Sequence, residues 1–296
     1  MPKVSVIMPC YNVAQYVGEA IESILNQTFS DFEFIIINDG STDDTAQIIR
    51  RYAAQDKRIK FIDNTQNQGF IAVSNQCLDV AMGDYIAKMD SDDISMPERL
   101  ETQVAFLDAN PNIGMVGAAY KTFGAFERTI VNPKTIKLFD LLSGCKTTIV
   151  MFRRNIIEKH HLRYDSKFVA CEDYDFYTRF IKYADIANLP DVLYLYRIHG
   201  NNASIINNDI QTQNTNIIRR RILDMMCSDQ RTAVHLMSMT SETSRKFYLF
   251  GIIPIVRRKQ YALTKTRYYL FNKIPLFKVQ NGKIYLFEFI KIGDLR

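Results

Sequence analysis

The feature that most constrains the fold is the alternation, over the first hundred residues, of short apolar runs with segments of helical periodicity. The apolar runs are rich in β-branched residues and end at turn formers or polar clusters, as strands do. Expected strands cover residues 4–9, 32–37, 59–62 and 85–89, and expected helices cover 17–25, a stretch from about 41, 70–81 and a stretch from about 97. Alternation at this spacing favours right-handed crossovers on a mostly parallel sheet flanked by helices. The sequence therefore predicts an α/β fold.

Three polar clusters follow the first, second and fourth expected strands. They are residues 9–12 (Pro-Cys-Tyr-Asn), 38–43 (Asn-Asp-Gly-Ser-Thr-Asp) and 90–93 (Asp-Ser-Asp-Asp). In sheets of this kind, ligands bind outside the carboxyl ends of the strands. The three clusters are therefore predicted to converge on one edge of the sheet and to form a site.

The acidic cluster at 90–93 indicates what that site binds. The sequence has no GxGxxG after the first strand and no GxxxxGK[ST], so neither a dinucleotide fold nor a P-loop is supported. A divalent cation is another means of holding a diphosphate, and Mg²⁺ and Mn²⁺ prefer oxygen ligands. Three neighbouring carboxylates would also repel one another without a cation. The alternative is an ordinary acidic turn before a helix.

Four motifs in order resemble those of the family 2 inverting glycosyltransferases, which have the GT-A fold. The resemblance covers roughly residues 3–206, and its motifs lie at 4–12, 37–43, 89–93 and 171–174. The overall run, including 146–154 and 196–199, is most similar to bacterial lipooligosaccharide and capsule N-acetylhexosaminyltransferases. The resemblance implies a Rossmann-like GT-A domain and an inverting, metal-dependent hexosyltransferase.

The resemblance also implies how the donor is bound. Asp39 would accept a hydrogen bond from uracil N3–H, which implies a UDP-sugar, and Asp90 would lie near the ribose. Arg197 would add positive charge beside the leaving group. The full donor-binding set implied by the resemblance is Pro9, Tyr11, Asn12, Asp39, Asp90, Ser91 and Arg197.

Metal binding and catalysis are implied for five further residues. Asp92 would ligate Mn²⁺ or Mg²⁺, and Asp93 is the alternative ligand within the same cluster. His199 matches a position that supplies a metal or diphosphate contact in some relatives; a structural turn histidine is the other interpretation. Asp173, beside Glu172, would take the acceptor hydroxyl proton in a single in-line displacement. The alternative for this acidic pair is an ordinary loop.

The sequence departs from the family pattern at two points. Asn38 stands where relatives often carry an aspartate, and no Gln-x-x-Arg-Trp motif occurs, since the chain contains no tryptophan. The missing motif is the signature of processive synthases. We therefore expect addition of one sugar per encounter.

The C-terminal part of the chain differs in charge from the rest. Residues 245–296 contain twelve Lys or Arg and two acidic residues, whereas residues 1–244 have a net charge of −5. Aromatic and aliphatic residues between basic ones recur there, which suits an anionic membrane surface. Strands or short helices packed on the catalytic domain, or an oligomer contact, are the alternatives. The expected organisation is a catalytic domain at 1–209, a helical linker at 210–244 and a helical or aromatic-basic extension at 245–296.

The sequence also predicts a compartment. Nothing at the N-terminus resembles a signal peptide, and no apolar stretch approaches the roughly 18 residues that cross a bilayer. The five cysteines are scattered and odd in number, which favours a reducing compartment. We expect a cytoplasmic protein, peripheral on the inner face of the cytoplasmic membrane.

The predicted function is non-processive transfer of GlcNAc, GalNAc, Gal or Glc from a UDP-sugar to a saccharide or lipid-linked acceptor, in surface polysaccharide or lipooligosaccharide synthesis. One alternative is a sugar nucleotidyltransferase, whose glycine-rich phosphate loop is missing here. Another is an inactive sugar-nucleotide-binding scaffold, which the presence of both Asp92 and Asp173 disfavours. The basic tail has no accompanying nucleic-acid motif, so no nucleic-acid partner is expected.

Overall fold

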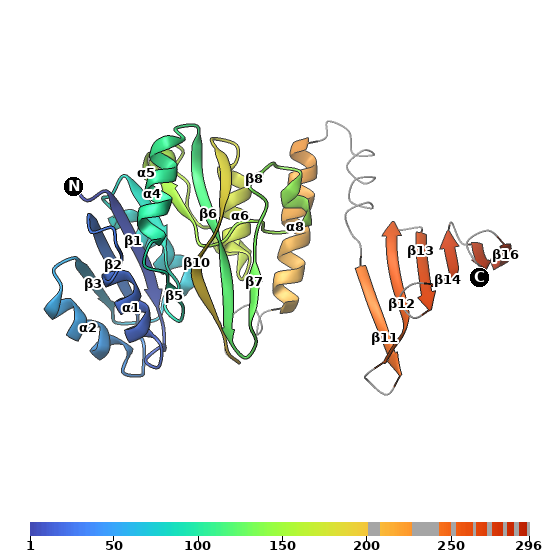
Figure 1. The fold of residues 1–296 in the computed structure, drawn as a ribbon, viewed down its shortest axis with the longest axis horizontal. Coiled ribbons are helices and arrows are strands. Elements are labelled where there is room, and N and C mark those ends of the chain that lie inside the picture. Colours follow the sequence, from blue (N-terminus) through green and yellow to red (C-terminus); the bar gives the residue numbers. More distant parts are fainter. Residues whose placement is uncertain are drawn as a thin grey trace. The chain divides into compact units, whose positions relative to one another are not determined.

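The computed structural model describes residues 1–200 and 208–226 and, farther along the chain, the strands between Thr243 and Asp294. The chain divides into two compact units, Met1–Ile218 and Arg219–Arg296 (Figure 1). Within the described part of the chain, no helix has the length and hydrophobicity needed to cross a membrane.

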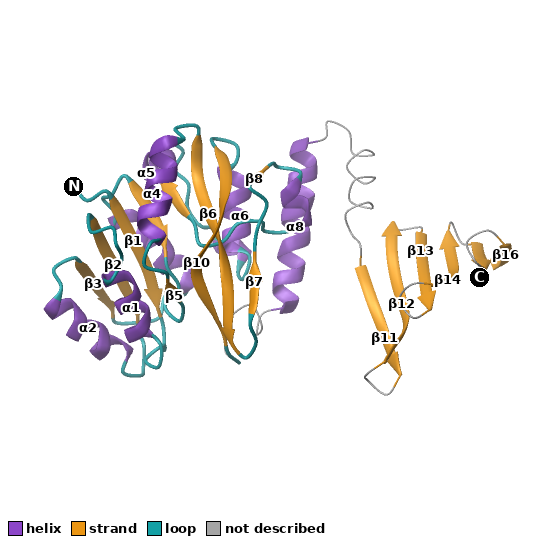
Figure 2. Ribbon diagram, in the orientation of Figure 1, coloured by secondary structure: helices purple, strands orange, loops and turns teal. Residues whose placement is uncertain are grey.

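The first unit is built around one mixed sheet with helices on both sides (Figure 2). The strand order is β3-β2-β1-β4-β9-β6-β10-β5, with β7 on β6 and β8 on β10. The strands are β1 Val4–Cys10, β2 Phe32–Asp39, β3 Ile59–Asn64, β4 Tyr85–Lys88, β5 Ile94–Ser95, β6 Ile113–Gly124, β7 Arg128–Ile130, β8 Thr135–Ile136, β9 Met151–Arg153 and β10 Asp185–Ile198. The helices are α1 Val17–Leu25, α2 Thr45–Gln55, α3 Phe70–Val80, α4 Arg99–Ala109, α5 Arg154–Lys159 and α6 Glu172–Phe180, with 3₁₀ turns η1 Asp140–Ser143 and η2 Ser166–Phe168. A further helix, α8 Asn208–Met226, begins in this unit and continues past its last residue, Ile218.

The N-terminal half of the sheet is parallel: β1 pairs with β2 and β4, and β2 pairs with β3. Every residue of β1 and β2 is buried, as expected for central strands covered on both faces. Alternate residues of β1 pack against α1 and α4 in one apolar cluster. On the opposite face Phe152 of β9 lies against Phe176 and Phe180 of α6, with ring centroids 5.8 and 6.4 Å apart. The predicted α/β fold, a mostly parallel sheet flanked by helices, is confirmed.

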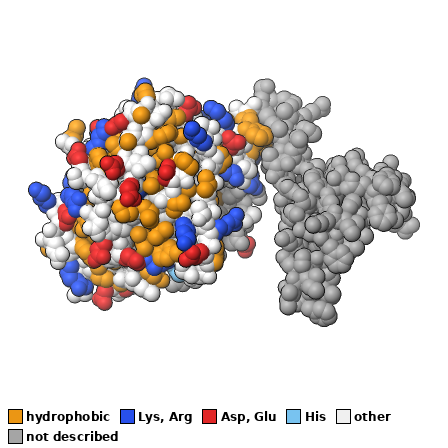
Figure 3. All heavy atoms as spheres, viewed as in Figure 1, with side chains coloured by type: hydrophobic (Ala, Val, Ile, Leu, Met, Phe, Trp, Pro, Cys, Tyr) orange, Lys and Arg blue, Asp and Glu red, His pale blue; other side chains and the backbone are white. Residues whose placement is uncertain are grey.

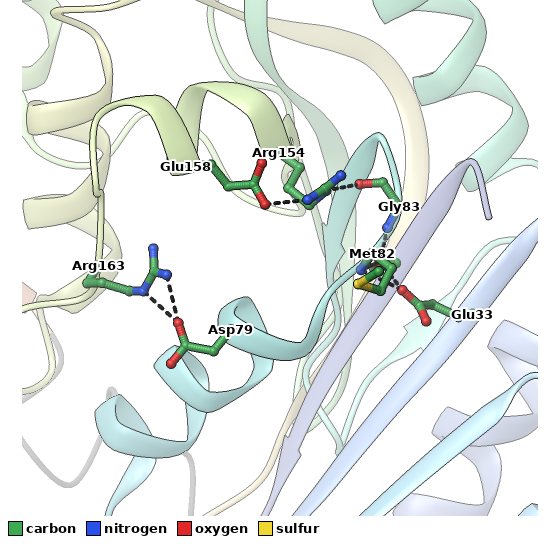
Figure 4. A network of polar contacts seen from close by, with 8 residues as sticks. Glu33, Asp79, Met82, Gly83, Arg154, Glu158 and Arg163 are labelled. Carbon is green, nitrogen blue, oxygen red and sulfur yellow. Dashed lines mark hydrogen bonds and ion pairs between the residues drawn. The ribbon is translucent and has the colours of Figure 1, made fainter. Parts of the chain in front are cut away.

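A polar network lies at the amino end of β4. Arg154 donates from Nε to the carbonyl of Gly83 at 2.7 Å and forms an ion pair with Glu158 (Figure 4). The same turn is bound by buried Glu33 of β2, which accepts from the Met82 amide. Because Gly83 precedes β4, this network braces the edge of the sheet that lies opposite the carboxyl ends.

Two predicted helix starts are displaced. The helix expected from about residue 41 begins at Thr45, because the Asp43 carboxylate binds the amides of Ala14 and Thr45 and holds the preceding residues in a turn. The helix expected from about residue 97 begins at Arg99 as α4, after β5, which pairs with β10.

The described strands of the second unit form an antiparallel sheet in sequential order, β11 to β16. They are β11 Thr243–Leu249, β12 Ile253–Ala262, β13 Lys265–Leu270, β14 Ile274–Gln280, β15 Lys283–Leu286 and β16 Ile290–Asp294. The expectation of a helical extension is therefore wrong for these residues. The first part of the predicted linker is helical in α8, whereas residues 227–242 lie outside the described residues. The predicted boundaries at 209 and 244 stay predictions.

Candidate active site

A cavity of about 780 Å³ opens at the carboxyl ends of β1, β2 and β4. It is the edge at which the polar clusters were expected to converge, and most of the predicted site residues meet there. Those lining the cavity are Pro9, Tyr11, Asp39, Asp90, Ser91, Asp92, Glu172 and Asp173. Asn12, Asp93, Arg197 and His199 are not in its lining.

Asn12 joins the loops that follow β1 and β2. Its backbone has φ of 51°, a left-handed conformation that asparagine tolerates better than most residues. The side-chain Oδ1 accepts from the Thr42 amide at 2.8 Å, and the Asn12 amide donates to Ser41 Oγ at 2.9 Å. These contacts hold the two loops together, so Asn12 fixes loops that line the cavity although its own side chain does not line it.

Asp39, at the end of β2, is buried and already holds a neighbouring loop. Its two carboxylate oxygens accept from the amides of Gln68 and Gly69 at 2.8 and 2.9 Å. This arrangement fixes the chain just before α3 and presents the carboxylate at the cavity wall. Each carboxylate oxygen can accept more than one hydrogen bond, so Asp39 keeps capacity for a ligand donor.

In the acidic turn after β4, Asp93 is fully buried and Asp90 is half-buried. The Asp90 amide donates to Tyr194 Oη at 3.0 Å, and Asp93 Oδ1 accepts from the Arg197 amide at 2.7 Å. Burial, followed by the charges of Asp90 and Asp92, raises the pKa of Asp93 to about 9. Burial also raises the pKa of Asp90, although Lys88 opposes it. A cation beside this turn would favour the ionised forms.

Asp92 differs from Asp93 because its side chain reaches the cavity. Asp92 Oδ2 lies 3.0 Å from Nε2 of His199, whose ring stacks on Tyr16 with centroids 4.9 Å apart. Arg197 lies behind the turn, where Nε donates to the Asp92 carbonyl at 2.8 Å and the guanidinium pairs with Glu19. The structure thus brings Asp92 and His199 together, and the Arg197 side chain binds the backbone of the turn.

The charged side chains of the site suit a divalent cation whose coordination is completed by the substrate. Asp39, Asp90, Asp92, Glu172 and Asp173 line the cavity together with one lysine, so the wall is net acidic and a diphosphate would need a counter-charge there. Among the described residues no group of three His, Cys, Asp or Glu side chains is arranged to hold an ion. Asp92 and His199 would therefore act as two protein ligands, as Mg²⁺ and Mn²⁺ accept when phosphate oxygens fill the remaining positions.

Asp173 lies in the first turn of α6 and forms an ion pair through Oδ2 with Lys88 of β4. Its other oxygen, Oδ1, is buried without a hydrogen-bond partner from the described residues. Nearly all buried polar atoms are satisfied, so an exception in a cavity wall indicates a partner supplied by a ligand or water. Beside it, burial and then the charge of Asp173 raise the pKa of Glu172.

Three features of the site were missed from the sequence. Lys88 interrupts an apolar strand directly before the acidic cluster, and a charge in a buried strand was the available signal. Arg99 is fully buried and donates to the Lys88 carbonyl at 2.6 Å, which no motif indicated. The third is α8, whose Gln211 and Thr215 line the cavity although the helix was expected to be a linker. Gln211 also donates to the Ala170 carbonyl at 3.1 Å, just before the α6 acids.

Known sequences and structures similar to this chain include glycosyltransferases. The family described as glycosyl transferase family 2 matches residues 5–181. An uncharacterised glycosyltransferase of Haemophilus influenzae is 34% identical over 234 residues, 74% of this chain and 72% of that protein. The chondroitin synthase of Pasteurella multocida is 27% identical over 91% of this chain, which spans only 29% of the synthase.

Two solved structures share the fold. The crystal structure of S. aureus TarS 1-349 in complex with UDP-GlcNAc has a TM-score of 0.64 and 20% identity, covering 80% of this chain and 70% of that one. A mannosyltransferase from Pyrobaculum calidifontis in complex with GDP-Man and Mn²⁺ has a TM-score of 0.59 and 18% identity, covering 80% and 68%. At these identities the likeness is one of fold.

Proposed function

Because this chain belongs to glycosyltransferase family 2, we propose that it transfers one hexose or N-acetylhexosamine per encounter from a UDP-sugar, with inversion, to a saccharide or lipid-linked acceptor. The proposed setting is bacterial surface polysaccharide or lipooligosaccharide synthesis. Similarity to the chondroitin synthase, a polysaccharide-forming relative, supports that setting.

The observation that carries the proposal is the position of Asp173. It shares one cavity with Asp39 and the acidic turn, and it offers a carboxylate with an unsatisfied oxygen. In the proposed step, this carboxylate takes the proton of the acceptor hydroxyl. The hydroxyl oxygen forms the new bond to the anomeric carbon, while the bond from that carbon to the diphosphate oxygen breaks and UDP leaves with the electron pair.

A UDP-sugar is the proposed donor, and N-acetylglucosamine is the first sugar to test. The fold neighbour TarS was solved with UDP-GlcNAc, whereas the mannosyltransferase was solved with GDP-Man, so the fold accommodates either nucleotide. The Asp39 carboxylate, at the cavity wall, is the proposed acceptor for the N3–H donor of uracil. Pro9 and Tyr11, in the same wall, would border the base and ribose.

Mn²⁺ or Mg²⁺ is the proposed cofactor, held by Asp92 and His199. When bound, the ion supplies positive charge that stabilises the departing diphosphate. The chain itself contributes the placement of the two ligands: Arg197 holds the backbone of the turn, and Tyr16 stacks on the imidazole. The Mn²⁺ complex of the mannosyltransferase supports the choice of metal.

A panel of nucleotide sugars tests this function. We expect the protein with Mn²⁺ and a mixture of saccharide acceptors to release UDP from a UDP-sugar, and to be inactive with GDP- and dTDP-sugars. The assay also separates the alternatives: a nucleotidyltransferase would instead release pyrophosphate from UTP and a sugar 1-phosphate. Binding of UDP-sugars without turnover of any of them would favour the inactive scaffold.

The second unit is proposed to hold the enzyme on an anionic lipid surface, at the inner face of the cytoplasmic membrane. The backbone register sets Lys259 opposite Arg267, and Arg267 opposite Lys278. Each Lys or Arg near an anionic membrane surface contributes about 1 kcal/mol to binding. By contrast, basic and acidic side chains of the first unit are interspersed on the face seen in Figure 3.

A further inference from the structure

We propose that Lys88 is the positioning residue of the transfer reaction: its ammonium group fixes the Asp173 carboxylate on the cavity wall in the place where the acceptor hydroxyl must meet it. This inference rests on the proposed function, in which Asp173 is the base. It adds a residue that the sequence motifs do not mark.

The first support is the way in which the backbone of Lys88 is fixed. Lys88 is the last residue of β4 and stands opposite Ile7 of the central strand. Its amide donates to the Val150 carbonyl at 3.0 Å, and its carbonyl accepts from buried Arg99 at 2.6 Å. A residue held on both sides in this way has little freedom at its Cα. Its side chain therefore starts from a fixed point at the edge of the cavity.

The second support is the enclosure of the side chain. Only 10% of the Lys88 side chain is exposed, and Nζ lies 5.6 Å from the ring centroid of Phe70 and 6.0 Å from that of Tyr164. Both rings are within the range of a cation–π contact. The aromatic groups direct the ammonium toward the carboxylate of Asp173, which comes from another element, α6.

The third support is electrostatic. Burial alone would lower the pKa of Lys88, but Asp173, Asp90 and Glu172 outweigh it and hold that pKa well above its ordinary value. Lys88 is therefore a permanent cation within a net acidic wall. Removal of one member of a buried ion pair leaves the other charge uncompensated, so the carboxylate would lose its fixed position along with its partner.

A competing role for Lys88 is binding of the donor diphosphate, since it is the one lysine or arginine that lines the described cavity. The two roles differ in kinetics. A residue that positions the base affects the chemical step and hence kcat, whereas a residue that binds the diphosphate equally in ground and transition states affects KM.

The test begins with Lys88→Met, which keeps the length of the side chain and removes its charge. We expect kcat to fall on the order of 10²-fold, the loss typical of a displaced catalytic group, with KM for the UDP-sugar and the calorimetric affinity for UDP unchanged. Lys88→Arg, which can still pair with the carboxylate, is expected to recover at least a tenth of wild-type kcat. A rise in KM with kcat unchanged would overturn the proposal in favour of diphosphate binding.

Lys60→Met is the matched control. Lys60 also pairs with a carboxylate, Glu33, on a strand of the same sheet, but neither residue lines the cavity. We expect this variant to keep wild-type kinetics. Thermal unfolding of all variants identifies any that fail to fold; should Lys88→Met be one, Lys88→Gln takes its place, with the same kinetic criteria.

A double-mutant cycle separates this proposal from the proposed function. If Asp173 is the base and Lys88 acts through it, then Lys88→Met should cause little further loss in the Asp173→Asn protein. Full independent losses in the two backgrounds would contradict the positioning role while leaving the base assignment intact. Retained transfer by Asp173→Asn alone would instead refute the assignment of Asp173 as the base, on which the role of Lys88 rests.

Discussion

Two adjacent aspartates of the acidic turn have different surroundings, although the sequence presents them as equivalent. Asp92 reaches the cavity and contacts His199, whereas Asp93 is fully buried and accepts from the Arg197 amide. An isolated Asp-Ser-Asp-Asp run cannot reveal this division. It depends on β10, which brings Arg197 and His199 to the turn from a hundred residues farther along the chain.

This difference predicts unequal effects of two amide substitutions on metal dependence. Asp92→Asn should raise the Mn²⁺ concentration needed for half-maximal activity by about tenfold or more, since even indirect partners of a metal contribute 10- to 100-fold to affinity. Asp93→Asn should leave that concentration unchanged, because Asp93 is fully buried and its Oδ1 already accepts from the Arg197 amide. Titration of activity with Mn²⁺ after EDTA treatment measures both, and the reverse order of effects would identify Asp93 as the ligand.

At the scale of elements, the strands and helices of the first hundred residues could be predicted because periodicity is a local signal. Val4–Cys10 and Val17–Leu25 appear where the pattern put them. The start of α2 could not be predicted in this way, because it depends on the hydrogen bond between Asp43 and the amide of Ala14, which belongs to another loop. The same limit applies to the site: motifs indicated Asp39 and Asp173, but Lys88 becomes part of it only through its ion pair with Asp173 of α6.

The loop after β2 offers a test at this scale. Gly40 has φ of 65°, and a Cβ there would lie 2.7 Å from the Asn67 amide nitrogen. Gly40→Ala should therefore lower the free energy of unfolding by about 1–3 kcal/mol and weaken UDP binding, since the displaced segment is the one that Asp39 holds. Urea unfolding and calorimetry measure the two effects.

Gly18→Ala is the control for that substitution. Gly18 lies in α1, where the nearest atom to a new Cβ is Tyr52 Oη at 3.5 Å. Alanine is favoured over glycine in a helix by up to about 1 kcal/mol, so this variant should be as stable as the wild type or more so. Equal destabilisation by both substitutions would mean that the Gly40 loop is not under the expected constraint.

The whole molecule combines an acidic first part with a basic C-terminal part, and the second compact unit contains the basic strands. Replacing three basic residues of those strands by glutamine should weaken binding to phosphatidylglycerol vesicles roughly 100-fold, since each nearby Lys or Arg contributes about 1 kcal/mol. The binding of the wild type should also fall with added salt. The substitutions are Lys259→Gln, Arg267→Gln and Lys278→Gln.

The matched control removes the same charge from exposed positions of the first unit, at Lys57, Lys159 and Lys182. Vesicle co-sedimentation should show wild-type binding for this control and no binding of any variant to uncharged phosphatidylcholine vesicles. If both triple variants bind equally well, the basic strands do not form the membrane contact.

The central claim is that Asp173 is the base for transfer from a UDP-sugar, and one comparison tests it most directly. Transfer of sugar from the UDP-sugar that the panel selects is measured for the wild type and Asp173→Asn, with UDP affinity determined for both. We predict that kcat falls on the order of 10³-fold, within the usual range for loss of a general base, while UDP affinity stays the same. Undiminished transfer by Asp173→Asn would contradict the claim.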